Sequence, residues 1–234
     1  MELPRYNPTS RQHGLAGERQ PPRYPAESPE TRDAARRAAH AAKISYRELP
    51  HAIDVESALA ADYPNVTEPL TLKRGEAADA LKKSPHVLRG RMEVGGQDHF
   101  YLEGHIAFAI PGEDEDVTVH SSTQHPSEVQ HMVAHVLGVA SNAVTILARR
   151  MGGGFGGKET QPNLFAAVAA VAAKKYNRAV KIRPDRDDDM IATGKRHDFV
   201  NSYEVGYDDD GRILAVRGQF AARCGFSADL SGPV

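Results

Sequence analysis

The 234-residue sequence contains a single cysteine, Cys224, and this scarcity excludes several kinds of site. One thiol cannot form a disulfide within the chain, and by itself it cannot hold an all-cysteine zinc or iron–sulfur centre. The sequence also lacks any run of about 18 uninterrupted apolar residues, which a membrane-spanning helix needs. The N-terminal stretch MELPRYNPTSRQHG has no apolar core of the secretory type. A reduced, cytoplasmic setting is therefore the expectation.

An excess of basic charge is missing as well. The 29 Lys and Arg residues are balanced by 31 Asp and Glu residues, so the formal net charge is −2 with the histidines neutral. Nucleic-acid binding would need a clustered basic surface. We therefore expect neither nucleic acid nor a membrane as a partner. The hydrophobic share of 40% is that of an ordinary globular protein.

The first 66 residues do not form a complete folding unit by their pattern. Residues 1–29 are rich in Pro, Arg, Gln and Gly without apolar periodicity, which predicts a disordered or unrelated leader. The segment TRDAARRAAHAA predicts a helix with Ser28 as N-cap and Pro29 at the first helical position. The strand-like segment KISYREL follows. A lone helix and strand cannot bury a core, so this region is expected to be the remnant of a larger unit.

The remainder of the chain predicts a mixed α/β fold with antiparallel pieces. Strand-like runs lie on both sides of a Gly-Gly-Gln turn in GRMEVGGQDHFYLEGHIAFAIP, and further strands are predicted in VTVHSST, AVTILARR and AVKIRP. In HPSEVQHMVAHVLG the apolar residues repeat with helical period, and Gly138 stands where a C-cap glycine belongs. TQPNLFAAVAAVAAKKYN predicts a buried apolar helix, DRDDD an acidic turn, and residues 201–223 a hairpin closed by Asp-Asp-Gly.

A glycine loop, MGGGFGGKE, separates a predicted strand from a predicted helix. Five of the six residues from Gly152 to Gly157 are glycine, so the backbone must approach something closely or adopt positive φ angles. A tight packing turn would explain this. The spacing also resembles a P-loop, but Glu159 stands where a P-loop needs Ser or Thr after Lys158. The pattern GxGxxG is satisfied too, although it is weak by itself as a dinucleotide fingerprint.

Four segments in order carry a resemblance to a known family: GGQDHFYLEGH, STQHPSEVQHMVAHVLG, RRMGGGFGGKETQ and DRDDDMIATGKRHDF. They resemble the large molybdenum-binding subunit of bacterial-type xanthine dehydrogenases, within the xanthine oxidase and aldehyde oxidase family. The resemblance runs from about Thr31 to Val234, and residues 1–29 are outside it. It implies that residues 30–66 are the tail of a small α/β domain. Residues 67–234 would then be the N-terminal part of a truncated molybdenum-cofactor-binding domain.

The resemblance also implies a chemistry. Family members oxidise hypoxanthine and xanthine to uric acid, using water as the oxygen source. Their molybdenum is held by a pterin dithiolene and not by protein side chains, so no protein metal ligand is expected. Electrons leave through Fe–S clusters and FAD to NAD, and in the bacterial type these centres belong to a partner subunit. The implied partners are this Fe–S/FAD subunit, a purine substrate and the C-terminal half of the molybdenum domain.

The same resemblance assigns site residues. Gln97, in the Gly-Gly-Gln turn, is implied as a catalytic and cofactor-binding residue whose amide donates to the oxo ligand. Phe155 and Gly156 are implied to bring an aromatic edge and backbone N–H groups to the cofactor. Glu159 is implied to bind the purine by hydrogen bonding. A glutamate stabilised by the dipole of the following helix would explain Glu159 equally well on physical grounds.

Other ionisable groups are expected to be structural. His131 and His135 have a spacing that suits zinc, but no third ligand accompanies them. The aspartates of the acidic turn are expected to pair with nearby basic residues and not with magnesium; the basic residues are Arg183, Arg186, Lys195 and Arg196. The catalytic glutamate base of the family has no counterpart here, so the chain alone is expected to be inactive. A non-catalytic interaction remnant, or an aldehyde oxidase-type relative, remains the alternative.

Overall fold

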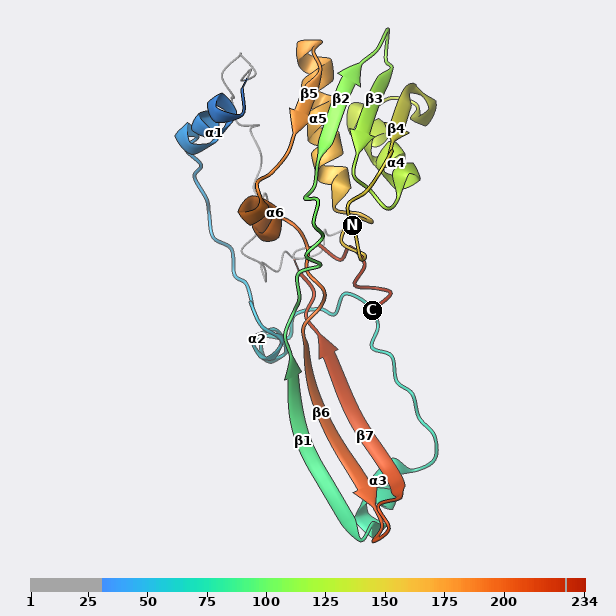
Figure 1. Cartoon of the computed structure of the whole chain (residues 1–234). Coiled ribbons are helices and arrows are strands. Elements are labelled where there is room, and N and C mark those ends of the chain that lie inside the picture. The colour runs from blue at the N-terminus through green and yellow to red at the C-terminus, as the bar shows by residue number, and fades with distance from the viewer. Residues whose placement is uncertain (1–30, 226) are drawn as a thin grey trace.

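The computed structural model describes residues 31–225 and 227–234. Figure 1 shows two β-sheets toward opposite ends of an elongated molecule, with irregular segments running between them. The leader predicted at residues 1–29 lies outside the described residues, and so does the helix start predicted at Ser28 and Pro29. The combination of helices with mixed and antiparallel sheets confirms the predicted α/β class.

The N-terminal segment forms helices but no strand. Helix α1 (Arg32–Ala41) is capped by Thr31, whose hydroxyl accepts a hydrogen bond from the Ala34 N–H at 3.2 Å. The strand predicted at residues 43–49 is wrong, since this stretch is exposed and has no regular structure. No strand of the described residues lies against it, and a strand without a partner leaves its backbone groups unpaired. A short helix, α2 (Val55–Ala60), follows.

One sheet is a three-stranded antiparallel ribbon. Its strands occur in the order β1 (His86–Val94), β6 (Phe199–Tyr207) and β7 (Ile213–Ala222). Helix α3 (Ala77–Lys83) packs at one end of it. The predicted hairpin is confirmed, and Asp208 closes its turn by accepting hydrogen bonds from the N–H groups of Asp210 and Arg212.

The other sheet has four strands and two covering helices. The order is β4 (Val144–Leu147), β3 (Val117–Ser121), β2 (Ala107–Pro111) and β5 (Val180–Ile182). Strands β3 and β4 are parallel, and the other pairs are antiparallel. The connection between β3 and β4 contains α4 (Pro126–Leu137) and the short 3-10 turn η1 (Ser141–Ala143), and α5 (Pro162–Tyr176) links β4 to β5. Figure 1 shows both helices on the same side of the sheet.

The main hydrophobic core lies between these two helices and the four-stranded sheet. Val129 and Val133 of α4 are fully buried, whereas Met132 and Val136 of the same predicted apolar repeat are 40% and 49% exposed. Helix α5 contributes small side chains, which let it approach the sheet closely; these are Ala166, Ala169, Ala170 and Ala173. Its opposite side is about half exposed at Leu164 and Val168, so the helix is buried on one face and not all round as predicted. None of the described helices has both the length and the apolar character needed to cross a membrane.

The acidic segment differs from its prediction. It forms a helix, α6 (Arg186–Ala192), and not a turn, with acidic residues in the first turn where the helix dipole favours them. The predicted ion pairs with neighbouring basic residues are also wrong. Asp185 instead pairs with Arg32 and Arg36 of α1. Asp189 faces inward and is 1% exposed.

Asp189 is the centre of a buried polar cluster that holds α6 against the segment between β1 and β2. Its carboxylate accepts hydrogen bonds from the Tyr101 hydroxyl at 2.7 Å and from the His105 N–H at 2.6 Å. The His105 Nδ1 atom lies 3.0 Å from the same carboxylate, and its ring stacks on Phe165 of α5. Burial alone would raise the pKa of Asp189, but the hydrogen bonds from His105 and Tyr101 outweigh it and hold the pKa well below its usual value.

This cluster predicts a strong effect of Asp189→Asn. Loss of the carboxylate should lower the free energy of unfolding by about 3 kcal/mol at neutral pH, since it breaks a buried charged network. Because the folded-state pKa is depressed, the carboxylate stabilises the fold above its ordinary value of 3.8, and this contribution is lost as the pH falls below it.

Denaturant unfolding from pH 7 down to acid checks both points. The stability of Asp189→Asn should depend less on pH below about 4 than that of the unmodified chain. Asp188→Asn, at an exposed position of the same helix, is the matched control and should change little. Equal stability of the two variants at pH 7 would contradict the assignment.

Candidate functional site

The glycine loop lies between β4 and α5, and two segments of the chain hold it. On one side is the stretch before β2, where Glu103 and Gly152 form two hydrogen bonds: the Glu103 N–H donates to the Gly152 carbonyl, and the Gly152 N–H donates to the Glu103 carboxylate. On the other side is the stretch 122–124 that directly follows β3. The loop therefore sits at the end of the four-stranded sheet from which α4 and α5 start.

Three of the loop glycines lie where a side chain would overlap a neighbouring residue. A Cβ on Gly152 would lie 2.6 Å from Cβ of Glu103. A Cβ on Gly154 would lie 2.4 Å from Oε1 of Gln124. A Cβ on Gly157 would lie 2.7 Å from Cγ of His99 and 2.8 Å from Cε1 of Tyr101. Such distances are far inside van der Waals contact, so a side chain at any of these positions would force either the loop or the neighbouring side chain to shift. The packing-turn interpretation is correct for these glycine positions.

The two residues between Gly154 and Gly157 are turned outward. Phe155 has a φ of +55°, which is uncommon for a residue with a side chain, and its ring is 75% exposed. Gly156 follows with a φ of +90°. The carboxylate of Glu159 and the Nε2 atom of His99 each come within 3.9 Å of the position that a Cβ on Gly156 would take. The structure therefore brings Phe155, Gly156 and Glu159 together, and a backbone held in such a conformation is typical of a functional site.

Gln97 does not join this group through any hydrogen bond of the described residues. Its side-chain oxygen accepts a hydrogen bond from Nη1 of Arg196 at 3.0 Å, and its backbone forms an isolated bridge with the same residue. The glutamine whose side chain does contact the loop is Gln124. Its Oε1 accepts hydrogen bonds from the N–H groups of Gly156 at 3.0 Å and Lys158 at 3.1 Å.

Gln124 was missed in the sequence, although it lies inside one of the segments that carry the resemblance. Its amide nitrogen makes no hydrogen bond within residues 31–225 and 227–234, and the residue is exposed. The amide therefore binds the loop with its oxygen and keeps a neutral donor free. A polar side chain directly after a predicted strand, on the same sheet edge as the loop, was the signal that could have identified it.

Lys158 excludes the P-loop interpretation. A P-loop lysine must reach phosphate oxygens, whereas Lys158 is completely buried and donates from Nζ to the Ser122 hydroxyl at 2.8 Å. Its Nζ atom lies 4.7 Å from the centroid of the Tyr101 ring. Burial lowers the pKa of this amine, and the negative charges of Glu103 and Asp189 partly oppose that effect.

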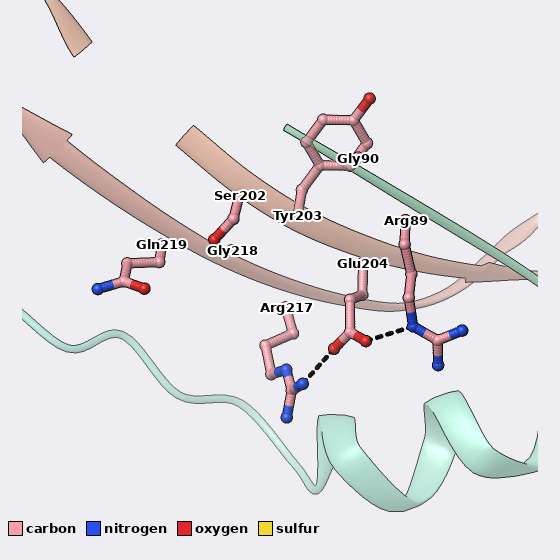
Figure 2. Close-up of a pocket in the computed structure, with 8 residues that line it drawn as sticks. All are labelled: Arg89, Gly90, Ser202, Tyr203, Glu204, Arg217, Gly218 and Gln219. Atoms are coloured by element: carbon pink, nitrogen blue, oxygen red, sulfur yellow. Dashed lines mark hydrogen bonds and ion pairs between the residues drawn. The ribbon is translucent and has the colours of Figure 1, made fainter. Parts of the chain in front are cut away.

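Two hollows of the surface are broad and open to solvent. The larger one, of about 730 Å³, lies on the three-stranded sheet, where Glu204 stands between Arg89 and Arg217 (Figure 2). Hydrogen bonding to Arg89 is the main cause that lowers the pKa of Glu204. This hollow shares no residue with the glycine loop. A smaller hollow of about 300 Å³ includes Glu103 and Ser122, which contact the loop.

Side chains that could bind a metal ion do not gather in the described part of the chain. No group of three or more His, Cys, Asp or Glu residues is placed there to hold an ion. His131 and His135 lie on α4 without a third ligand among these residues. A metal centre at the glycine loop would therefore have to be held by something other than these side chains.

Comparison with known proteins identifies the family. The model of the molybdopterin cofactor-binding domain matches residues 60–234. The chain belongs to this family. It is 41% identical to xanthine dehydrogenase/oxidase of Gallus gallus over 204 residues, which cover 86% of this chain and 15% of that protein. It is 40% identical to xanthine dehydrogenase of Emericella nidulans over 206 residues, 87% of this chain and 15% of that one. The chain thus spans about 15% of the length of these relatives.

Solved structures agree with this assignment. The fold is similar to that of an aldehyde oxidoreductase from Desulfovibrio gigas, with a TM-score of 0.70 and 25% identity over 82% of this chain and 22% of that chain. It is also similar to quinoline 2-oxidoreductase from Pseudomonas putida 86, with a TM-score of 0.68 and 24% identity, covering 81% and 25% of the two chains. The resemblance inferred from the four sequence segments is therefore confirmed at the level of the family and the fold.

The packing of the loop predicts the effect of a single methyl group. Gly157→Ala should destabilise the chain by about 1–3 kcal/mol, because the new Cβ overlaps the rings of His99 and Tyr101. Gly95→Ala is the matched control, since nothing lies within 4 Å of its Cβ position. Thermal unfolding of both variants checks this, and equal melting temperatures would contradict the packing described.

Proposed function

We propose that this chain supplies part of the molybdenum–pterin site of a purine hydroxylase that oxidises hypoxanthine and xanthine to uric acid. The observation that carries the proposal is the outward-facing part of the glycine loop. Phe155, Gly156 and Glu159 are displayed together there, next to a glutamine amide with a free donor. The family membership and the names of the most similar curated relatives support it.

The residues fit a molybdenum–pterin group. When bound, that group supplies the hydroxylation of a ring carbon with water as the oxygen source. The metal is carried by the pterin, which agrees with a loop that offers neutral donors and an aromatic side chain. Gly156 would allow close approach to its backbone because it has no side chain, and the exposed Phe155 ring would cover the group from one side.

Two glutamines compete for the role of the amide donor. The sequence resemblance proposes Gln97, whose oxygen is bonded to Arg196. The contacts favour Gln124, because its oxygen is fixed by two loop N–H groups and its nitrogen is therefore aimed by the loop itself. We propose Gln124 as the principal donor and keep Gln97 as the alternative.

Glu159 is the proposed substrate-binding residue. It lies beside the loop, just before α5, and its carboxylate is partly exposed to the space next to Gly156. A carboxylate in a closed pocket needs hydrogen-bond donors, and the N–H groups of a purine provide them. An aldehyde offers no such donor, so Glu159 favours a purine over the substrate class of the aldehyde-oxidising structural relative.

The remaining parts of the proposal concern what lies outside this chain. We propose that Fe–S clusters and FAD on a partner subunit carry the electrons to NAD, in the cytoplasm. The rest of the molybdenum domain would complete the site. Within this chain, residues 67–234 would form the N-terminal part of the cofactor domain and residues 30–66 the tail of a preceding α/β domain.

Steady-state kinetics with xanthine test the substrate assignment. The chain would be assembled with the polypeptides that complete the molybdenum subunit and with the Fe–S/FAD subunit. Glu159→Val should lower kcat/KM for xanthine by about 10- to 100-fold, which corresponds to the loss of a charged hydrogen bond. Molybdenum content should remain unchanged, since Glu159 is proposed to bind the substrate and not the cofactor.

The same assay separates the two glutamines. Gln124→Ala should reduce turnover at least tenfold more than Gln97→Ala if Gln124 is the donor. The reverse order would assign the role to Gln97. Unchanged xanthine turnover in Glu159→Val would overturn the assignment of Glu159 as the substrate-binding residue, and a correctly assembled complex without turnover would favour a non-catalytic interaction remnant.

A further inference from the structure

Lys158 is an unusual residue to find at the base of a surface loop. It is 0% exposed, whereas lysine is rarely buried completely because its ammonium group loses hydration. It follows Phe155 by three residues and immediately precedes Glu159. A residue that is costly to bury at this position requires a physical explanation.

The contacts of Lys158 provide one. Its N–H donates to Oε1 of Gln124 at 3.1 Å, and its carbonyl accepts from the Gln124 N–H at 2.7 Å and from the Thr123 hydroxyl at 3.3 Å. Its Nζ atom donates to the Ser122 hydroxyl at 2.8 Å. Every polar atom of Lys158 is therefore bonded to the three consecutive residues Ser122, Thr123 and Gln124.

These three residues are fixed in turn. They directly follow β3, and the N–H of Ser122 donates to the carbonyl of Ile106 at 3.2 Å, which extends the pairing between β3 and β2. The Tyr101 ring lies against the Lys158 ammonium, and the Tyr101 hydroxyl is bonded to the buried Asp189. Lys158 thus connects the run of glycines to the end of a sheet.

We propose that Lys158 is a positioning residue, which through Ser122 and Gln124 fixes the loop so that Phe155 and Glu159 are displayed. The inference rests on the proposed function only for what the displayed residues bind. The anchoring itself concerns this chain alone. Without the bond from Nζ, the glycine-rich backbone has many accessible conformations, and the left-handed φ of Phe155 has less to hold it.

Amide hydrogen exchange of the whole chain tests the anchor in the absence of any cofactor. Lys158→Met keeps an unbranched side chain of similar volume and removes the ammonium group. The loop amides of Gly156 and Lys158 should then exchange about tenfold faster, as expected for one lost hydrogen bond. Amides of α4 and β3 should keep their rates. Lys83→Met, at an exposed position in α3, is the control and should change nothing at the loop.

Ser122→Ala provides a second route to the same bond and remains usable if Lys158→Met fails to fold. It should also accelerate loop exchange about tenfold. The double variant should exchange about as fast as either single variant, because both remove one interaction. Independent effects that multiply to about 100-fold, or loop rates that do not change in Ser122→Ala, would overturn the proposal.

This outcome is separable from the test of function. Faster loop exchange with unaltered xanthine kinetics in the assembled enzyme would show an anchor that does not serve the site, and would overturn the positioning role. Faster exchange together with a raised KM for xanthine at constant molybdenum content is the expected result. If the unmodified complex has no xanthine activity, the exchange measurement still decides whether Lys158 holds the loop.

Discussion

The candidate site depends on one contact, the docking of the glycine loop onto the three residues that follow β3. Glycines 154 and 157 permit this contact because any side chain there would overlap Gln124, His99 or Tyr101. Gln124 and Lys158 then hold the backbone in place by hydrogen bonds. The result is a loop whose packed glycines hold an outward-facing pair of residues, Phe155 and Gly156, between them. Glycine allows the loop backbone to approach these residues closely. The hydrogen bonds to the end of β3 then restrict the conformations that a glycine-rich backbone could otherwise adopt.

Other parts of the fold hold in place the segments that contact the loop. The four-stranded sheet and its two helices form the core that keeps the end of β3 in place. The cluster around Asp189 fixes the segment that carries Tyr101 and His105 below the loop. In the described part of the chain, irregular stretches that cross between the sheets connect the three-stranded sheet to this region (Figure 1). The loop therefore lies at the end of the four-stranded sheet, beside the segment that Asp189 of α6 holds through Tyr101.

The sequence predicted most of the elements whose signal is local. Helix α4 follows from its apolar period and Gly138, and the β6–β7 hairpin from its Asp-Asp-Gly turn. The strand at residues 43–49 failed because propensity cannot say whether a partner strand exists. The acidic segment failed because aspartates suit a turn and a helical first turn equally well.

The resemblance predicted some of the residues that the structure brings together at the loop, but it did not predict Gln124. The resemblance assigned Phe155, Gly156 and Glu159 to the site, and the structure brings these three residues together while their roles stay a prediction. The contact of Gln124 with the loop joins positions more than thirty residues apart, and a sequence pattern does not encode such a distance. The resemblance assigned the amide donor to Gln97 in the Gly-Gly-Gln turn, and that assignment stays a prediction. Buried polar residues such as Lys158 and Asp189 were missed because charge predicts exposure in most proteins.

The central claim is that this chain contributes to a molybdenum–pterin site, and the most direct measurement is metal and pterin content. The chain would be purified in complex with the polypeptides that complete its subunit, and both components would be quantified per chain. The account predicts one molybdenum and one pterin for each chain. A stable, folded complex that contains neither, under conditions where a relative acquires both, would contradict it.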